Sequence, residues 1–216
     1  MTTGKFAMTM LPIVLIGILQ YSCTPSVSGV ETTNGFTVVA TCGTIEGTAP
    51  PYAQVFLFDT AYIPYLDRGF GFGTSVDIDG AYSFSVAPGT YNILVIDREG
   101  SQAGLLQKTV ASETLPDKES EVPEKNLLTE TGTVSGTVAA ESGTTLLVYL
   151  AGTGYYRLLT GTTPFTLYSV PSGPALLCCA ILSTGERVSS TVEVVKNLPI
   201  EVTPGSVTKI GTVTLD

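Results

Sequence analysis

Few side chains in this 216-residue chain could carry chemistry, because the sequence contains no histidine. Without imidazole, there is no Ser-His-Asp or Cys-His arrangement, no histidine metal site and no imidazole base near neutral pH. Paired carboxylates remain, and Asp77 with Asp79 is the obvious pair. Because Asp79 directly precedes Gly80, we expect this pair to form hydrogen bonds within a turn. The pair is a weak candidate for Ca²⁺ ligation, and catalysis is the least favoured of the three roles. We therefore predict a protein that is not an enzyme and that needs no cofactor.

A second candidate group is aromatic and lies in a Gly-rich insertion over residues 60–73. Exposed rings can stack on sugars, and loops on a rigid scaffold often carry binding sites. The alternative is a loop folded over the end of a domain with its rings buried, and the absence of tryptophan favours that alternative. A smaller aromatic pair occurs at Tyr155-Tyr156. The candidate ligand-binding residues are Tyr62, Tyr65, Phe70 and Phe72.

The N-terminus carries an apolar run, Met8 to Leu19, preceded by Lys5 and followed by Ser22-Cys23. The run is too short to cross a bilayer and is typical of a secretory signal. A cysteine directly after the cleavage point resembles the lipobox of bacterial lipoproteins, although Gln20 stands where that box has leucine. We predict a signal peptide over residues 1–22 and lipidation of Cys23. Plain secretion and an uncleaved signal anchor are the alternatives.

A lipidated Cys23 predicts that the protein is exported and anchored to a membrane. The expected location is the outer membrane or the cell surface, on the periplasmic or extracellular face. The formal net charge is −9, and the sequence has no basic cluster. Such a chain is a poor ligand for nucleic acid, so we expect none as a partner. The expected partners are the membrane, through the lipid anchor, and a protein or polysaccharide.

Composition favours an all-β chain. Hydrophobic residues make up 44% of the sequence, charged residues only 13%, and turn residues recur throughout. Besides Cys23 there are three cysteines, without the spacing of a disulfide framework. Cys178 and Cys179 are neighbours in an apolar strand, so their side chains should point to opposite faces. We expect them to be free, buried thiols.

Two stretches of about 80 residues look like copies of one unit. Each has a Gly-Thr-x-x-Gly strand, an apolar strand, an alternation of aromatic and apolar residues, a Pro-Gly type turn, and a longer apolar strand. The matching segments are 43–47, 55–58, 82–84, 87–89 and 91–96 in the first unit, and 132–136, 146–150, 165–167, 170–173 and 175–182 in the second.

The first unit contains a hairpin signal, because Val76–Ile78 and Ala81–Val86 alternate on either side of Asp79-Gly80. This alternation should place Tyr82, Phe84 and Val86 on one buried face. After the next turn, Tyr91, Ile93 and Val95 should extend that face.

The remaining segments define the expected domain boundaries. Residues 23–42 are predicted as an N-terminal segment or hairpin that either joins the first domain or forms a stalk. The domains themselves are predicted over residues 43–128 and 129–216. An acidic, linker-like stretch covers residues 112–125, and Asn126 to Leu128 are an alternative closing strand for the first unit.

The first unit resembles carboxypeptidase regulatory-like domains. The residues that carry the resemblance are Ala53 to Asp59, Thr74 to Phe84 and Pro88-Gly89-Thr90-Tyr91. The second unit is a more divergent copy that lacks the Asp-x-Asp-Gly motif. The resemblance implies two tandem prealbumin-like or Ig-like β-sandwich domains, seven-stranded and non-catalytic, after an N-terminal signal helix. We therefore predict a lipid-anchored surface protein that acts as a structural, adhesive or accessory module. The alternative is a carbohydrate-binding lipoprotein that uses the insertion around Tyr62 to Phe72.

Overall fold

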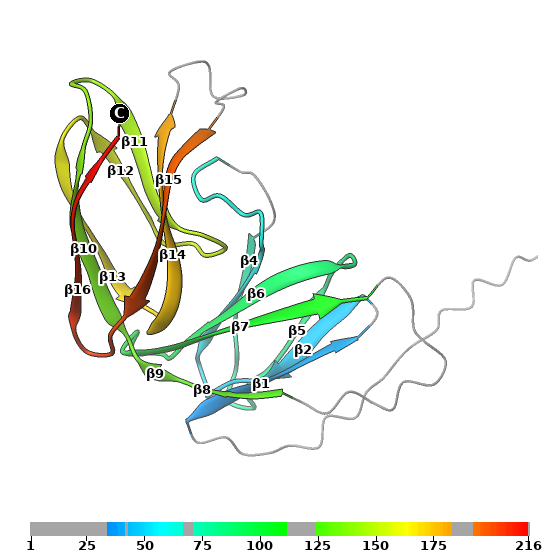
Figure 1. Ribbon diagram of the computed structural model, residues 1–216. Coiled ribbons are helices and arrows are strands. Elements are labelled where there is room, and N and C mark those ends of the chain that lie inside the picture. Colours follow the sequence, from blue (N-terminus) through cyan, green and yellow to red (C-terminus); the bar gives the residue numbers. More distant parts are fainter. Residues whose placement is uncertain (1–33, 42, 67–70, 112–123, 183–191, 216) are drawn as a thin grey trace, which may run out of the picture.

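The computed structural model describes residues 34–41, 43–66, 71–111, 124–182 and 192–215, without the side chains of 192–195. Within these residues all regular structure is strand, arranged in four sheets (Figure 1). This confirms the all-β prediction. The predicted signal peptide, Cys23, the first half of the 23–42 hairpin, Cys42 and Phe70 lie outside the described residues, as does most of the acidic stretch 112–125.

The first sandwich is built from two facing sheets. One sheet has the order β5-β2-β1-β8 and the other has the order β4-β3-β6-β7-β9. Buried residues from both sheets, including Phe36, Ile45, Leu57 and Ile93, form one apolar core between them. The strands are β1 (Gly35–Thr41), β2 (Thr44–Thr48), β3 (Gln54–Asp59), β4 (Gly71–Ser75), β5 (Ala81–Ser85), β6 (Gly89–Ile96), β7 (Gln102–Val110), β8 (Glu124–Leu127) and β9 (Thr129–Glu130).

The second sandwich pairs a β13-β10-β16 sheet with a β12-β11-β14-β15 sheet. Its seven strands enclose a separate core that contains Val134, Leu146, Phe165 and Leu177. The strands are β10 (Gly132–Ala139), β11 (Thr145–Leu150), β12 (Tyr156–Thr160), β13 (Thr163–Val170), β14 (Gly173–Leu182), β15 (Val192–Val202) and β16 (Val207–Thr214).

The two sandwiches pair their strands in the same order, except that the first has two additional strands, β1 and β9. In the second sandwich β16 lies parallel and directly beside β10. In the first, β1 pairs with β2 on one side and β8 on the other. Residues from Gly35 onward are therefore part of the first sandwich and do not form a stalk.

The hairpin predicted at Asp79-Gly80 is wrong. Val76–Ile78 is not a strand, and the turn instead connects β4 in one sheet with β5 in the other. β5 pairs with β2, with Tyr82 opposite Gly47. The predicted alternation is nevertheless confirmed, because Tyr82, Phe84 and Val86 contact the first core. An Asp-Gly turn permits either connection, and only long-range pairing distinguishes them.

The junction between the sandwiches is much shorter than the charged stretch suggests. Residues 124–130 form β8 and β9 of the first sandwich, and β10 of the second begins at Gly132. Thr131 alone separates them, and its N–H donates to the main-chain oxygen of Ser101 at 2.9 Å. Its own oxygen accepts from the N–H of Gly205. The connecting residue is therefore tied to both sandwiches.

Candidate functional site

The structure disperses the aromatic residues of the insertion (residues 60–73). Tyr62 is half-buried, with its ring centroid 4.9 Å from that of Phe58. Phe72 lies on the edge strand β4 and is 52% exposed. Tyr65 is 53% exposed and points to the other sandwich, where its ring centroid is 6.2 Å from that of Tyr156. These three rings do not form one platform.

The apolar residues of the insertion have a different role. Ile63 and Leu66 pack against the outer face of the β12-β11-β14-β15 sheet, the face turned away from the second core. In Figure 1 the described part of the insertion after β3, residues 60–66, extends from the first sandwich toward β14 and β15. The covered sheet residues are buried: Leu147, Tyr149, Cys178, Ala180 and Leu182. The first sandwich thus covers an apolar face of the second.

A reciprocal contact runs in the opposite direction. The turn before β12 places Tyr155 against Phe58, Leu94 and Ala103, which lie on the outer face of the β4-β3-β6-β7-β9 sheet. Gly154 lies close to the ring of Phe58, because a Cβ added there would be 3.2 Å from its Cζ. Each sandwich therefore covers an outer sheet face of the other.

Hydrogen bonds flank these apolar contacts. The side-chain N–H of Asn92 donates to the main-chain oxygen of Gly152 at 2.9 Å. Near the junction, the hydroxyls of Thr129 and Ser172 lie 2.6 Å apart, and Ser172 also donates to the main-chain oxygen of Glu130. Between the sandwiches lies a cavity of about 230 Å³, lined by Leu105 and by residues of the second sandwich such as Leu150 and Leu176.

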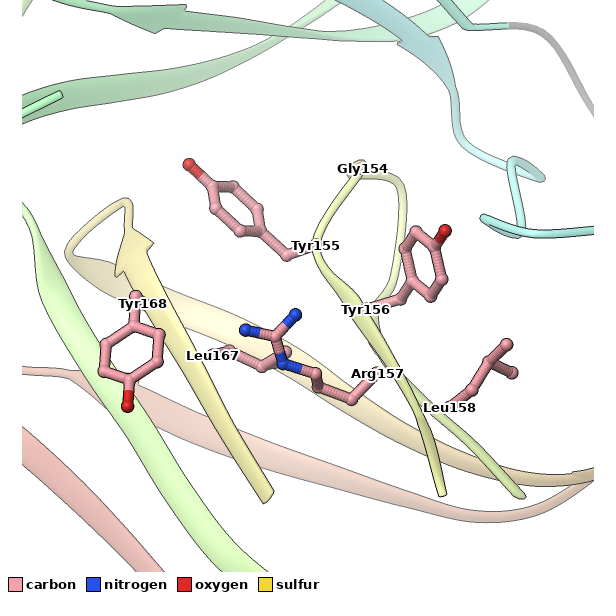
Figure 2. Close-up of a pocket in the computed structure, with 7 residues that line it drawn as sticks. All are labelled: Gly154, Tyr155, Tyr156, Arg157, Leu158, Leu167 and Tyr168. Carbon is pink, nitrogen blue, oxygen red and sulfur yellow. The ribbon is translucent and has the colours of Figure 1, made fainter. Parts of the chain in front are cut away.

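A larger, open cleft of about 540 Å³ lies between β12 and β13 (Figure 2). The strands belong to different sheets, and two side chains connect them. The Arg157 Nε–H donates to the main-chain oxygen of Thr166 at 3.0 Å, and the Tyr155 hydroxyl donates to that of Ser169 at 2.7 Å. The cleft is lined by Gly154, Tyr155, Tyr156, Arg157, Leu158, Leu167 and Tyr168.

Burial controls the titration of the phenols and thiols near these contacts. It raises the pKa of Tyr155 to about 12, and it raises the pKa of Tyr149 above its ordinary range. Burial and the neighbouring Cys178 raise the pKa of Cys179 to about 11, and burial also raises the pKa of Cys178. These groups are protonated at neutral pH, so none of them is an activated nucleophile.

The predicted free thiols on opposite faces are confirmed. Cys179 lies in the second core, whereas Cys178 lies under the insertion, and both are unpaired. Asp77 accepts the main-chain N–H of Asp79 at 3.0 Å, which is the expected turn bond. Among the described residues, no three His, Cys, Asp or Glu side chains gather where a metal could bind. Nor does a helix long and apolar enough to span a membrane occur in that part of the chain.

Sequence reasoning missed Ile63, Leu66 and the reciprocal packing. A signal existed, because β11 is apolar at consecutive positions from Leu146 to Leu150, and a strand of this kind is buried on both faces. The sequence could therefore have predicted a cover for this sheet. It could not have shown that the cover comes from the insertion of the other sandwich.

No family model matches the chain, and no curated protein matches it. Among solved structures, BcpA, the major pilin subunit of Bacillus cereus, is 12% identical with a TM-score of 0.24. A variant of that subunit is 13% identical with a TM-score of 0.25. Each match covers 79% of this chain and 63% of the pilin chain, so this chain spans less than two thirds of that length.

Proposed function

We propose that this protein is a non-catalytic, lipid-anchored surface module in which two β-sandwiches act as one stiff unit with a structural, adhesive or accessory role. One observation carries the proposal: each sandwich covers an outer apolar sheet face of the other, through Ile63 and Leu66 in one direction and Tyr155 in the other. A stiff body of this kind suits a surface protein that holds a binding region away from a membrane.

The contact between the sandwiches supports stiffness. Domains in one chain normally move relative to one another unless their interface is large and hydrophobic. Here the apolar contacts lie on two different sheets, and Thr131 leaves almost no slack at the junction. Rotation about the junction would uncover Cys178 and Leu94 at once, which costs free energy in proportion to the apolar area exposed.

The residue types support a role without catalysis. The sequence has no histidine, and the buried thiols and phenols described above are protonated at neutral pH. Asp77, the obvious carboxylate candidate, is engaged in its own turn.

Membrane attachment is proposed through Cys23. One acyl chain holds a protein only weakly, whereas the two or three chains of a bacterial lipoprotein anchor give stable attachment. The carbohydrate-binding alternative at residues 62–72 has less support, because Tyr62 packs inward on Phe58 and Tyr65 is directed to Tyr156.

The anchor is tested by detergent-phase partitioning of the full chain and of Cys23→Ser after expression in an exporting bacterial host. We expect the wild type in the detergent phase and Cys23→Ser in the aqueous phase. Equal aqueous partitioning of both proteins would remove the anchor from the proposal.

Stiffness is tested by small-angle X-ray scattering of Cys23→Ser, with and without Ile63→Ser and Leu66→Ser. We expect one compact scattering envelope for the parent and a larger radius of gyration when the two apolar contacts are lost. Ile78→Ser is the matched control, because Ile78 is 68% exposed. A parent as extended as the double variant would overturn the stiff unit.

A further inference from the structure

We propose that the cleft between β12 and β13 binds a carboxylate-bearing saccharide, with Arg157 holding the carboxylate and Tyr156 and Tyr168 contacting the sugar rings. The cleft is open, and about 540 Å³ suits one or two sugar rings. It lies on the second sandwich and does not use the aromatic residues of the insertion for ligand contact. The proposal therefore assigns a binding function to residues 155–158, 167 and 168.

Arg157 supplies the anion recognition. Its Nε–H is committed to the oxygen of Thr166, which fixes the side chain and leaves the two terminal nitrogens available. The ion pair found among the described residues joins Lys108 to Glu124, so no described carboxylate neutralises Arg157. A guanidinium pairs well with a planar carboxylate, because two parallel N–H groups can donate to its two oxygens. Figure 2 shows Arg157 extending from β12 toward the strand that carries Leu167 and Tyr168.

The tyrosines supply ring contacts. Tyr168 is 62% exposed and Tyr156 is 38% exposed, so both present ring surface to solvent. Tyr156 is also supported by Tyr65 of the first sandwich, at 6.2 Å between ring centroids. A supported ring loses little freedom when a ligand binds, which favours affinity. Leu167 is buried and gives the cleft an apolar floor.

The hydrogen bonds across the cleft disfavour an extended peptide as the ligand. A peptide that added to β13 as a strand would need the main-chain oxygens along its free edge. Arg157 and Tyr155 already donate to the oxygens of Thr166 and Ser169 there. A ligand that stacks on rings and presents one charge fits the site better than one that requires backbone pairing.

The net charge of the protein further limits the class of ligand that this cleft can bind. At −9, the chain repels densely charged polyanions such as sulfated polysaccharides. A saccharide with isolated carboxylates carries enough negative charge to pair with Arg157 but too little to be strongly repelled by the acidic protein. The chemistry therefore selects a uronic-acid sugar over a sulfated or a neutral one.

The test compares a glucuronic-acid-terminated disaccharide with its neutral glucose counterpart, by ligand-observed NMR titration of the full-length Cys23→Ser protein. We expect the acidic sugar to bind at least about tenfold more tightly than the neutral one, as loss of a charge-assisted pair predicts. Arg157→Gln should abolish this preference, and Arg157→Lys should keep part of it. Arg98→Gln is the matched control, because Arg98 lies over Tyr52 in the first sandwich and should leave binding unchanged.

Tyr168→Ala gives a second, independent test, because the exposed ring of Tyr168 can be removed without disturbing either core. We expect it to weaken both sugars, whereas Arg157→Gln weakens only the acidic one. Equal binding of the two sugars, tighter binding of dextran sulfate or tetraglutamate, or unchanged binding in both variants would overturn the proposal. Neither Arg157 nor Tyr168 belongs to the contact between the sandwiches, so failure here leaves the stiff unit untouched.

Discussion

Asn92 in the first sandwich donates its side-chain N–H to the main-chain oxygen of Gly152 in the second, at 2.9 Å. The Nε2–H of Gln107 donates in turn to the side-chain oxygen of Asn92, which fixes the amide orientation. Gly152 has a φ of +64°, and a Cβ there would collide with the Asn92 amide. This bond therefore depends on a glycine in a left-handed turn and links the two domains directly.

Gly152→Ala should destabilise the protein by about 2–3 kcal/mol, through left-handed strain and loss of the Asn92 bond. The matched control is Gly143→Ala, which has a φ of +86° but no atom within 4 Å of the added Cβ. We expect a loss of about 1 kcal/mol there, from strain alone. Urea unfolding of both variants measures the difference. Equal losses would contradict the role of the interdomain bond.

Removal of the cover over Cys178 should expose its thiol. In the wild type Cys178 is 3% exposed, and burial raises its pKa, so alkylation at pH 8 should be slow. Ile63→Ala with Leu66→Ala should speed its labelling by about tenfold or more, because local opening then uncovers the site more often. Fragment ions from tandem mass spectrometry of the labelled peptide distinguish Cys178 from its neighbour Cys179, which should stay protected in the second core. Equal labelling of Cys178 in both proteins would rule out the insertion as its cover.

Stability should fall as the pH rises above about 9. The pKa of Cys179 is raised from about 9 to about 11, and that of Tyr155 from 10 to about 12. At a pH between the unfolded and the folded pKa of each group, the group has lost its proton in the unfolded chain and keeps it in the folded chain. Higher pH therefore favours unfolding. We expect a loss on the order of 2 kcal/mol between pH 8.5 and 11. Urea midpoints across this range measure it, and Cys179→Ala should reduce the slope; a flat profile would exclude the effect.

Tyr82 should contribute to the first sandwich through its hydroxyl. The O–H donates to the main-chain oxygen of Thr37 at 2.7 Å in a buried site, passing over Gly47 on the strand between them. Tyr82→Phe should cost about 1–2 kcal/mol, because it leaves a buried carbonyl without this donor. Gly47→Ala should cost more, since its Cβ would clash with Thr37. The control is Ser83→Ala, at an exposed neighbour, which should have an effect below about 0.5 kcal/mol in thermal unfolding.

The sequence by itself determined the all-β class, the alternation of Tyr82, Phe84 and Val86, the opposite faces of Cys178 and Cys179, and the turn role of Asp77. Each of these depends on neighbours along the chain, because side chains in a strand alternate with a period of two. The consecutive apolar residues of β11 also indicated a sheet buried on both faces.

Only the tertiary structure decided which strands pair, where the sandwiches join and what covers the sheets. It separated β4 from β5, inserted β1 beside β2, reduced the junction to Thr131 and placed Ile63 and Leu66 on the sheet face that contains Cys178. The cover over that face joins residues far apart in sequence, and local propensity is the same for several alternative strand pairings. The free energy gained by burying whole sheet faces against one another distinguishes these pairings. It depends on the packing of the complete folded chain and not on any single segment.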